Sequence, residues 1–282
     1  MKDWNISIAK GEKQLFINNL SGPTGRTEII MTVKELYEKM SERIPLELRE
    51  EWDNDGLMCS PDVNAEVNKT LVTLDVTEEI VDFAIERGFD LIVSHHPLLF
   101  KPVSSINDSD HISRKIIKLI ANGVSVFSFH TRLDKVAGGV NDKLAELIGV
   151  ENTEPFGSDS LGRIGDVEEM TMEDFAYKVK VSLGSDVVKY SDGYNTVRRV
   201  ALVGGDGKDY VREALKAGAD TYLSGRISYN LMEEASELGI NLVEAGHYFT
   251  EQPICEVFVD MLLEISPPMY VEVAKSNMIK YL

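Results

Sequence analysis

The chain has 282 residues, of which 43% are hydrophobic and 27% are charged, and its formal net charge is −18 at pH 7. This length and composition are typical of a soluble globular protein with one large or two modest domains. The strong negative charge repels nucleic-acid phosphate and anionic lipid, so nucleic acid is not the expected partner.

Cysteine content and the absence of apolar runs indicate the compartment. Cys59 and Cys255 are too few for a disulfide framework and too far apart in sequence for a zinc knuckle, which fits a reducing cytoplasm. The first ten residues lack the apolar stretch of a signal peptide, and no run approaches the length of a membrane span. The sequence therefore predicts a cytoplasmic protein without a membrane segment.

The N-terminal segment, residues 1–30, shows no sustained hydrophobic period. It is interpreted either as an extension or added leader, or as a native edge strand. A helix is predicted directly after Met31, because Thr32 is a suitable N-cap and Glu35 stands three residues later, as in a capping box.

Strands and helices are then predicted in alternation. The expected strands are 70–76, 90–96 and 124–130, and the expected helices are 77–88, about 110–122 and 139–149. Such alternation is typical of βαβ units, in which a mostly parallel sheet is buried on both faces.

The second half of the chain repeats the first. Residues 69–97 align without gaps onto 199–227 at a constant offset of 130, and 123–130 match 239–247 with one inserted residue. We interpret this match as a duplication. The predicted fold class is therefore α/β, with duplicated α/β halves and mostly parallel sheets flanked by helices. The predicted parts are a leader or extension (1–30), a first half (31–150), a connector (151–198) and a second half that closes the site (199–282).

Side chains that can bind metal follow the predicted strand ends. They are His95, His96, His130, Asp134, His247 and Glu251. In an open parallel sheet, ligands gather at the carboxyl ends of the strands. A helix beginning near residue 247 would place His247 and Glu251 on one face. Imidazole with carboxylate, without cysteine, suits Zn²⁺, Mn²⁺ or Fe²⁺.

The tandem histidines favour two metal ions over one. Successive strand side chains point to opposite faces, so His95 and His96 can enter one site only where the strand has ended and turned. Two neighbouring rings then reach two neighbouring ions more easily than a single ion, and Glu251 or Asp134 could bridge them. Two ions about 3.5–4 Å apart can activate water and polarise a carbonyl or phosphoryl oxygen.

Two further segments have simpler interpretations. The glycine-rich stretch 203–215 could cradle a phosphate, but it matches no established phosphate-binding motif, and a tight strand–helix turn is favoured. The segment 49–60 is rich in turn-forming residues, and Asn54-Asp55-Gly56 is expected to form a turn. Its acidic side chains could face the site, although their spacing does not establish this.

Five motifs in order resemble one protein family. EWDNDGLMCS, DLIVSHHPLLF, HTRLDKVAGGVND, SLGRIGDV and AGHYFTEQP are together similar to motifs of the dinuclear-metal family of Ngg-interacting-factor-three-like proteins. Bacterial members are often labelled GTP cyclohydrolase 1 type 2 homologues. The resemblance runs from about residue 32 to the end of the sequence. Residues 151–198 are too few for the inserted domain of longer members, which implies a short form.

The resemblance implies a ligand set, an assembly and a reaction. Its implied ligands for two divalent ions (Zn, Mn, Fe or Ni) are His95, His96, Asp134, His247 and Glu251. His130 matches a histidine that is either a ligand or a proton shuttle, and we expect it to be catalytic. Members commonly form hexameric rings, so a homohexamer is expected. The favoured function is a metal-dependent hydrolase of a small or nucleotide-like substrate, with a non-catalytic metal-binding scaffold or protein-interaction factor as the alternative.

Overall fold

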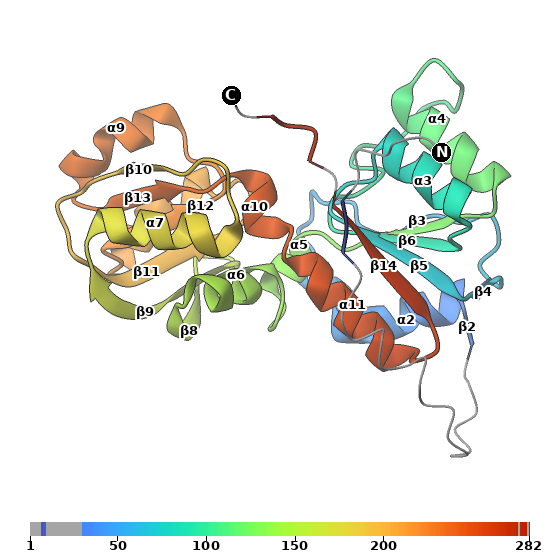
Figure 1. Cartoon of the computed structure of the whole chain (residues 1–282), viewed down its shortest axis with the longest axis horizontal. Coiled ribbons are helices and arrows are strands. Elements are labelled where there is room, and N and C mark those ends of the chain that lie inside the picture. Colours follow the sequence, from blue (N-terminus) through green and yellow to red (C-terminus); the bar gives the residue numbers. More distant parts are fainter. Residues whose placement is uncertain (1–6, 10–29, 276, 281) are drawn as a thin grey trace. The chain divides into compact units, whose positions relative to one another are not determined.

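The computed structural model describes residues 7–9, 30–275, 277–280 and 282. The chain divides into two compact units, shown in Figure 1. Unit 1 consists of Met1–Leu133 and Cys255–Ser276, and unit 2 consists of Asp134–Ile254 and Asn277–Leu282. Each unit contains one six-stranded sheet and its own helices.

The sheet of unit 1 has parallel strands at its centre. Its strands, in spatial order, are β1 (Ser7–Ala9), β14 (Tyr270–Lys275), β5 (Lys69–Thr73), β6 (Leu91–Ser94), β7 (Ser125–Ser128) and β3 (Gly56–Cys59). The four strands from β14 to β7 are parallel, and β1 and β3 pair antiparallel at the two edges. A separate antiparallel pair joins β2 (Met31–Thr32) and β4 (Glu66–Val67).

Helices cover both faces of this sheet (Figure 1). They are α2 (Val33–Arg43), η1 (Leu46–Leu48), α3 (Glu78–Arg87), α4 (His111–Ala121) and α11 (Ile254–Ile265). Ile80 and Phe83 of α3 and Leu119 of α4 join one apolar core with strand residues such as Ile92. On the other face, rings of α2 and α11 contact rings that follow or belong to β7: Tyr37 contacts Phe127, and Phe258 contacts Phe129. The central strands are thus buried on both sides, as parallel strands require.

The predicted helix start at Thr32 is confirmed. The Thr32 hydroxyl accepts a hydrogen bond from the Glu35 backbone N–H, and the Glu35 carboxylate accepts one from the Thr32 backbone N–H. These bonds satisfy donors that the first helical turn leaves without intrahelical partners. Helix α3 likewise begins at a side-chain cap, Thr77, and ends at Gly88 in the left-handed conformation.

Unit 2 has a related architecture, in which three parallel strands lie between antiparallel strands. Its strands, in spatial order, are β10 (Lys189–Ser191), β13 (Asn241–Glu244), β12 (Thr221–Ser224), β11 (Val197–Val203), β9 (Gly162–Met170) and β8 (Glu151–Phe156). Its helices are α6 (Val140–Ile148), α7 (Met172–Leu183), η2 (Lys208–Tyr210), α8 (Val211–Lys216), α9 (Tyr229–Leu238) and α10 (His247–Glu251). Two apolar cores flank the sheet, one beneath α6 and α7 and one beneath α8 and α9.

The register of the strands bears out the predicted duplication. Thr70 pairs with Leu91 in the β5–β6 ladder, and at the offset of 130 Val200 pairs with Thr221 in the β11–β12 ladder. The third parallel strand follows in the same order in both units, with an antiparallel strand beyond it. The predicted fold class is therefore confirmed.

The units follow different boundaries from those expected. Residues 151–198, expected to be a connector, supply β8, β9, α7 and β10 to unit 2, because the repeated βαβ core leaves sheet edges and an apolar face that these elements cover. Residues 255–276, expected in the second half, belong to unit 1, where β14 pairs with β5 and α11 packs on the sheet. Of residues 1–30, β1 forms an edge strand, while 1–6 and 10–29 lie outside the described residues.

The helix predicted to begin near residue 247 does so, but it ends after five residues and a second helix follows. Helix α10 ends at Glu251 and α11 begins at Ile254, with Pro253 between them. Proline has no backbone N–H and disturbs the preceding helical turn, which explains the break. Among the described residues, no helix has the length and apolar character needed to cross a membrane.

Candidate metal centre

Three imidazoles converge at the carboxyl ends of the strands in unit 1. His95 and His96 follow β6 directly, and His130 stands two residues after the end of β7. One ring nitrogen of each histidine lies within 4.8 Å of the corresponding nitrogens of the other two. The ring centroids of His95 and His96 are 5.1 Å apart, and those of His95 and His130 are 5.3 Å apart. The structure therefore brings these three predicted site residues together.

The backbone turns at the end of β6, which lets both neighbouring histidines enter one group. Ser94 Oγ donates a hydrogen bond to the His96 carbonyl over 2.9 Å, and the His96 backbone N–H donates to the Leu74 carbonyl over 3.0 Å. Ser94 Oγ also lies 2.9 Å from Ser128 Oγ at the end of the neighbouring strand. These buried hydroxyls tie the two strand ends to each other.

Each of the three rings is oriented by an oxygen at its Nδ1 atom. The Nδ1 of His95 lies 2.9 Å from the Phe129 carbonyl, that of His96 lies 2.7 Å from Asp75 Oδ1, and that of His130 lies 2.8 Å from Asp53 Oδ1. A carbonyl or an ionised carboxylate can only accept, so each Nδ1 carries the proton. In the neutral ring, Nε2 then holds the lone pair and is the nitrogen that can bind a metal.

This pattern fits a metal site. Histidines that bind metals almost always donate their other ring N–H to a carboxylate or a backbone carbonyl, which fixes the tautomer and the ring orientation. All three histidines have such an acceptor, and His95 is fully buried. The donors available here are therefore imidazole nitrogens, which suit Zn²⁺, Mn²⁺, Fe²⁺ or Ni²⁺.

Asp53 is a site residue that the sequence analysis did not assign. Its buried carboxylate accepts hydrogen bonds from His130 Nδ1, from the Thr131 backbone N–H over 3.1 Å and from Thr131 Oγ1 over 2.7 Å. Burial acts to raise the pKa of Asp53, but hydrogen bonding to His130 and its charge, with the bonds from Thr131, outweigh burial and lower the pKa to about 2. Asp53 is therefore ionised at neutral pH and holds the proton on His130 Nδ1.

Asp55 fixes the same segment of chain. Its Oδ2 accepts a hydrogen bond from the His130 backbone N–H over 3.0 Å and one from Arg132 Nε over 2.9 Å. Both side chains of the Asp55–Arg132 pair are fully buried, and the guanidinium lies 4.5 Å from the centroid of the Phe129 ring. Residues 54–56 do not form the expected turn: Gly56 begins β3, and the carboxylates of Asp53 and Asp55 on either side of Asn54 accept hydrogen bonds from His130 and Arg132.

Unit 2 brings together His247 and Glu251. These residues begin and end α10, and His247 Nε2 lies 2.9 Å from Glu251 Oε2, so the predicted shared face is confirmed. The Glu251 side chain is 6% exposed, whereas that of His247 is 44% exposed.

Glycines make the space for this pair. A Cβ atom at Gly205 would overlap Glu251 Oε1, and one at Gly225 would lie 2.6 Å from Thr250 Oγ1. The glycine-rich stretch is indeed a tight connection between β11 and η2, and its Gly205 backbone N–H donates to Thr250 Oγ1 over 3.1 Å. The small residues of this stretch therefore allow α10 to pack closely.

Asp134, the sixth predicted residue, is the first residue of unit 2. It lies in the short helix α5 (Thr131–Lys135), four residues after His130, and its carbonyl accepts a hydrogen bond from Asn141 Nδ2 over 3.2 Å. The predicted ligands thus belong to both units: His95 and His96 to unit 1, and Asp134, His247 and Glu251 to unit 2.

Fold and site together define a class: a duplicated α/β protein with candidate divalent-metal ligands at its strand ends. The chain belongs to the Duf34/NIF3 (NGG1p interacting factor 3) family, whose model matches residues 31–281. The family resemblance inferred from the motifs is therefore confirmed.

Several relatives cover most of the chain. A Clostridium perfringens protein named GTP cyclohydrolase 1 type 2 homolog is 35% identical over 232 residues, which are 79% of this chain and 88% of the relative. Among solved structures, the Staphylococcus aureus hypothetical protein SA1388 superposes with a TM-score of 0.80 at 27% identity, covering 90% of this chain and 100% of that chain. Reduced HcgD from Methanocaldococcus jannaschii has a TM-score of 0.77 at 28% identity, covering 89% of this chain and 100% of that one.

Proposed function

We propose that the protein binds two divalent metal ions through His95, His96, Asp134, His247 and Glu251 and uses them to hydrolyse a nucleotide-like or small cyclic substrate. The observation that carries the proposal is the group of three imidazoles, each with its Nδ1 proton held by an oxygen acceptor. A structural role alone does not require three neighbouring rings to be fixed in the same tautomer. The proposed site does, because His95 and His96 must each present an Nε2 lone pair to a metal ion, and His130 must present one to accept a proton.

The metals would supply Lewis acidity, which lowers the pKa of a water molecule and polarises the substrate oxygen that takes up negative charge. The remaining chemistry belongs to side chains. Asp53 holds the proton on His130 Nδ1, which leaves His130 Nε2 to accept a proton and later to return it to the leaving group. Ionised Asp53 also stabilises the imidazolium that forms when Nε2 is protonated.

The names of relatives support the substrate class. Relatives from Clostridium perfringens and Methanocaldococcus jannaschii, 35% and 33% identical to this chain, are both named GTP cyclohydrolase 1 type 2 homolog. We therefore place nucleotides first among the substrates to be tested. The proposal includes a cytoplasmic homohexameric ring, as the family resemblance implies, and light scattering at several salt concentrations tests it. A monomer under all conditions would contradict the proposed homohexamer.

The decisive experiment incubates the metal-loaded protein with GTP, other nucleotides, cyclic nucleotides, phosphoesters and small cyclic amides, with products followed by mass spectrometry. Replacing the proton-transferring ring in His130→Ala should lower turnover by about 10²–10⁴-fold while the metal content stays unchanged. His111→Ala is the matched control, because the His111 side chain is 69% exposed on α4.

Two outcomes would change the assignment. A loss of metal in His130→Ala would make His130 a ligand instead of a proton carrier. An absence of turnover in every substrate class, with both metals bound, would favour the non-catalytic alternative, a metal-binding scaffold or interaction factor. The family description, which names an interacting factor, makes that alternative specific.

A further inference from the structure

Two exposed aromatic side chains border His130 in unit 1. Trp52 is 62% exposed and Phe100 is 47% exposed. The centroid of the His130 ring lies 6.2 Å from that of Trp52 and 6.2 Å from that of Phe100, and the two aromatic rings are 6.1 Å apart. All three contacts are edge-to-face, so the rings form one cluster at the edge of the imidazole group.

The loops that carry these aromatic residues are held by the same contacts that build the site. Trp52 directly precedes Asp53, whose carboxylate binds His130 Nδ1. Phe100 follows the tandem histidines by four residues, and Asn54 Nδ2 donates a hydrogen bond to the Leu99 carbonyl, which joins the two loops. The positions of both rings are therefore coupled to that of His130.

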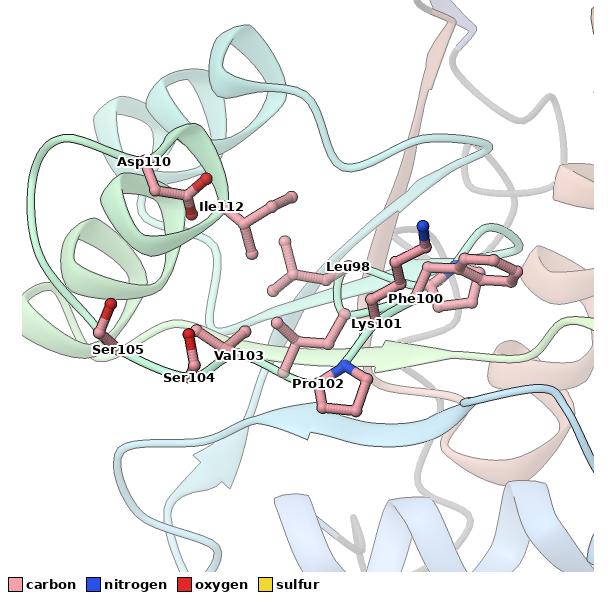
Figure 2. A pocket seen from close by; sticks show the side chains of 11 residues that line it. Leu98, Phe100, Lys101, Pro102, Val103, Ser104, Ser105, Asp110 and Ile112 are labelled. Carbon is pink, nitrogen blue, oxygen red and sulfur yellow. The ribbon is translucent and has the colours of Figure 1, made fainter.

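A pocket adjoins Phe100. Its volume is about 520 Å³, and it is lined by residues 97–105 together with Asp110 and Ile112. Figure 2 shows Phe100 and Lys101 at one end of this pocket and Asp110 and Ile112 at the other. The volume falls within the range of small-molecule sites in proteins, about 300–1,000 Å³. A ligand that contacts Phe100 thus has space for further groups.

We propose that Trp52 and Phe100 bind a planar heteroaromatic ring, such as a nucleobase, beside the imidazole group. Stacking against a flat ring removes the exposed face of an aromatic side chain from water and stabilises the complex, and every nucleobase offers such a flat face. Because Trp52 and Phe100 already contact each other, the ligand ring stacks on their exposed faces and does not enter between them. The inference rests on the proposed function for its substrate class, but this binding step does not itself require metal.

The sequence has two tryptophans, Trp4 and Trp52. The test therefore uses a Trp4→Phe variant, in which Trp52 is the only tryptophan that remains. Its fluorescence is followed during titration with guanosine monophosphate and with ribose 5-phosphate, which lacks the base. Guanosine monophosphate should quench Trp52 and bind more tightly than ribose 5-phosphate, with or without chelator. In calorimetry with the wild-type chain as reference, Trp52→Ala and Phe100→Ala should each weaken this binding by about 5- to 150-fold, and Trp52→Phe by less.

Tyr177→Ala is the matched control, since Tyr177 is 70% exposed on α7 in unit 2 and should leave the binding unchanged. Equal affinity for the two probes, or unchanged affinity in Trp52→Ala, would overturn the inference. So would a loss of assembly in Trp52→Ala without a loss of nucleotide affinity. Elemental analysis separates this inference from the proposed function: nucleotide binding through Trp52 in a protein that takes up no metal would refute only the hydrolase.

Discussion

The two units share a run of three parallel strands with an antiparallel strand beyond it, but they place different residues at equivalent strand ends. At the offset of 130, His95, which directly follows β6, corresponds to Gly225, which directly follows β12, and Asp75 corresponds to Gly205. In unit 1 these positions carry a candidate ligand and the carboxylate that orients one. In unit 2 they carry glycines, whose missing side chains leave space for α10.

The difference shows two ways to place candidate ligands at the carboxyl ends of parallel strands. Unit 1 presents imidazoles directly from the strand ends. In unit 2, glycines near the strand ends leave space for helix α10, which carries His247 and Glu251. The duplicated backbone therefore fixes where ligands can lie, while the side chains decide which element supplies them.

The largest expected effect concerns the buried ion pair between Asp55 and Arg132 in unit 1. Asp55→Ala should lower the free energy of unfolding by about 3–5 kcal/mol, because it leaves the Arg132 guanidinium buried without its carboxylate. Urea unfolding measures this loss. The matched control is Asp82→Ala, which removes a partly exposed partner of Lys118 and should cost about 1 kcal/mol or less. Equal losses in the two variants would show that the buried pair has no special role.

A second prediction concerns His95, the candidate ligand whose counterpart in unit 2 is Gly225. Loss of a residue that only orients a ligand weakens metal binding by about 10- to 100-fold. His95→Ala removes a proposed ligand itself, so it should weaken metal binding by more than about 100-fold. Competition with a fluorescent chelator gives the affinity. His111→Ala, on the exposed end of α4, should bind metal like the wild type. If His95→Ala did the same, unit 1 would not supply the metal site.

The smallest effect tests whether unit 2 needs its glycines for space. Gly205 and Gly218 both have positive φ, +63° and +85°, but a Cβ atom at Gly218 would meet no atom within 4 Å, whereas one at Gly205 would overlap Glu251. Gly205→Ala should therefore cost about 1–3 kcal/mol of unfolding free energy beyond the cost of Gly218→Ala. Thermal and urea unfolding of both variants give this difference. Identical stabilities would mean that Glu251 moves aside freely.

Local patterns were sufficient to predict the central part of the fold. The alternation of strands and helices and the offset of 130 predicted the parallel strands of both units, and Thr32 with Glu35 predicted the start of α2. Because parallel strands share one edge at their carboxyl ends, the same patterns predicted that His95, His96 and His130 would meet.

Long-range pairing could not be predicted in this way. The pairing of β14 with β5 joins residues about 200 positions apart, and the bond between Asp53 and His130 spans 77 positions. No local pattern specifies such partners, since the choice depends on which edges and polar groups the folded unit leaves unsatisfied. The break between α10 and α11 did have a local signal, Pro253, which the periodicity of the surrounding apolar residues obscured.

The central proposal is that His95, His96, Asp134, His247 and Glu251 bind two metal ions. Its most direct test is elemental analysis of the wild-type chain after equilibration with excess Zn²⁺ or Mn²⁺ and removal of unbound metal, alongside His96→Ala and Glu251→Ala, which remove one proposed ligand from each unit. We expect two ions per wild-type chain and fewer in both variants. A wild-type chain that retains no more than trace metal, or variants that retain two ions, would contradict the account.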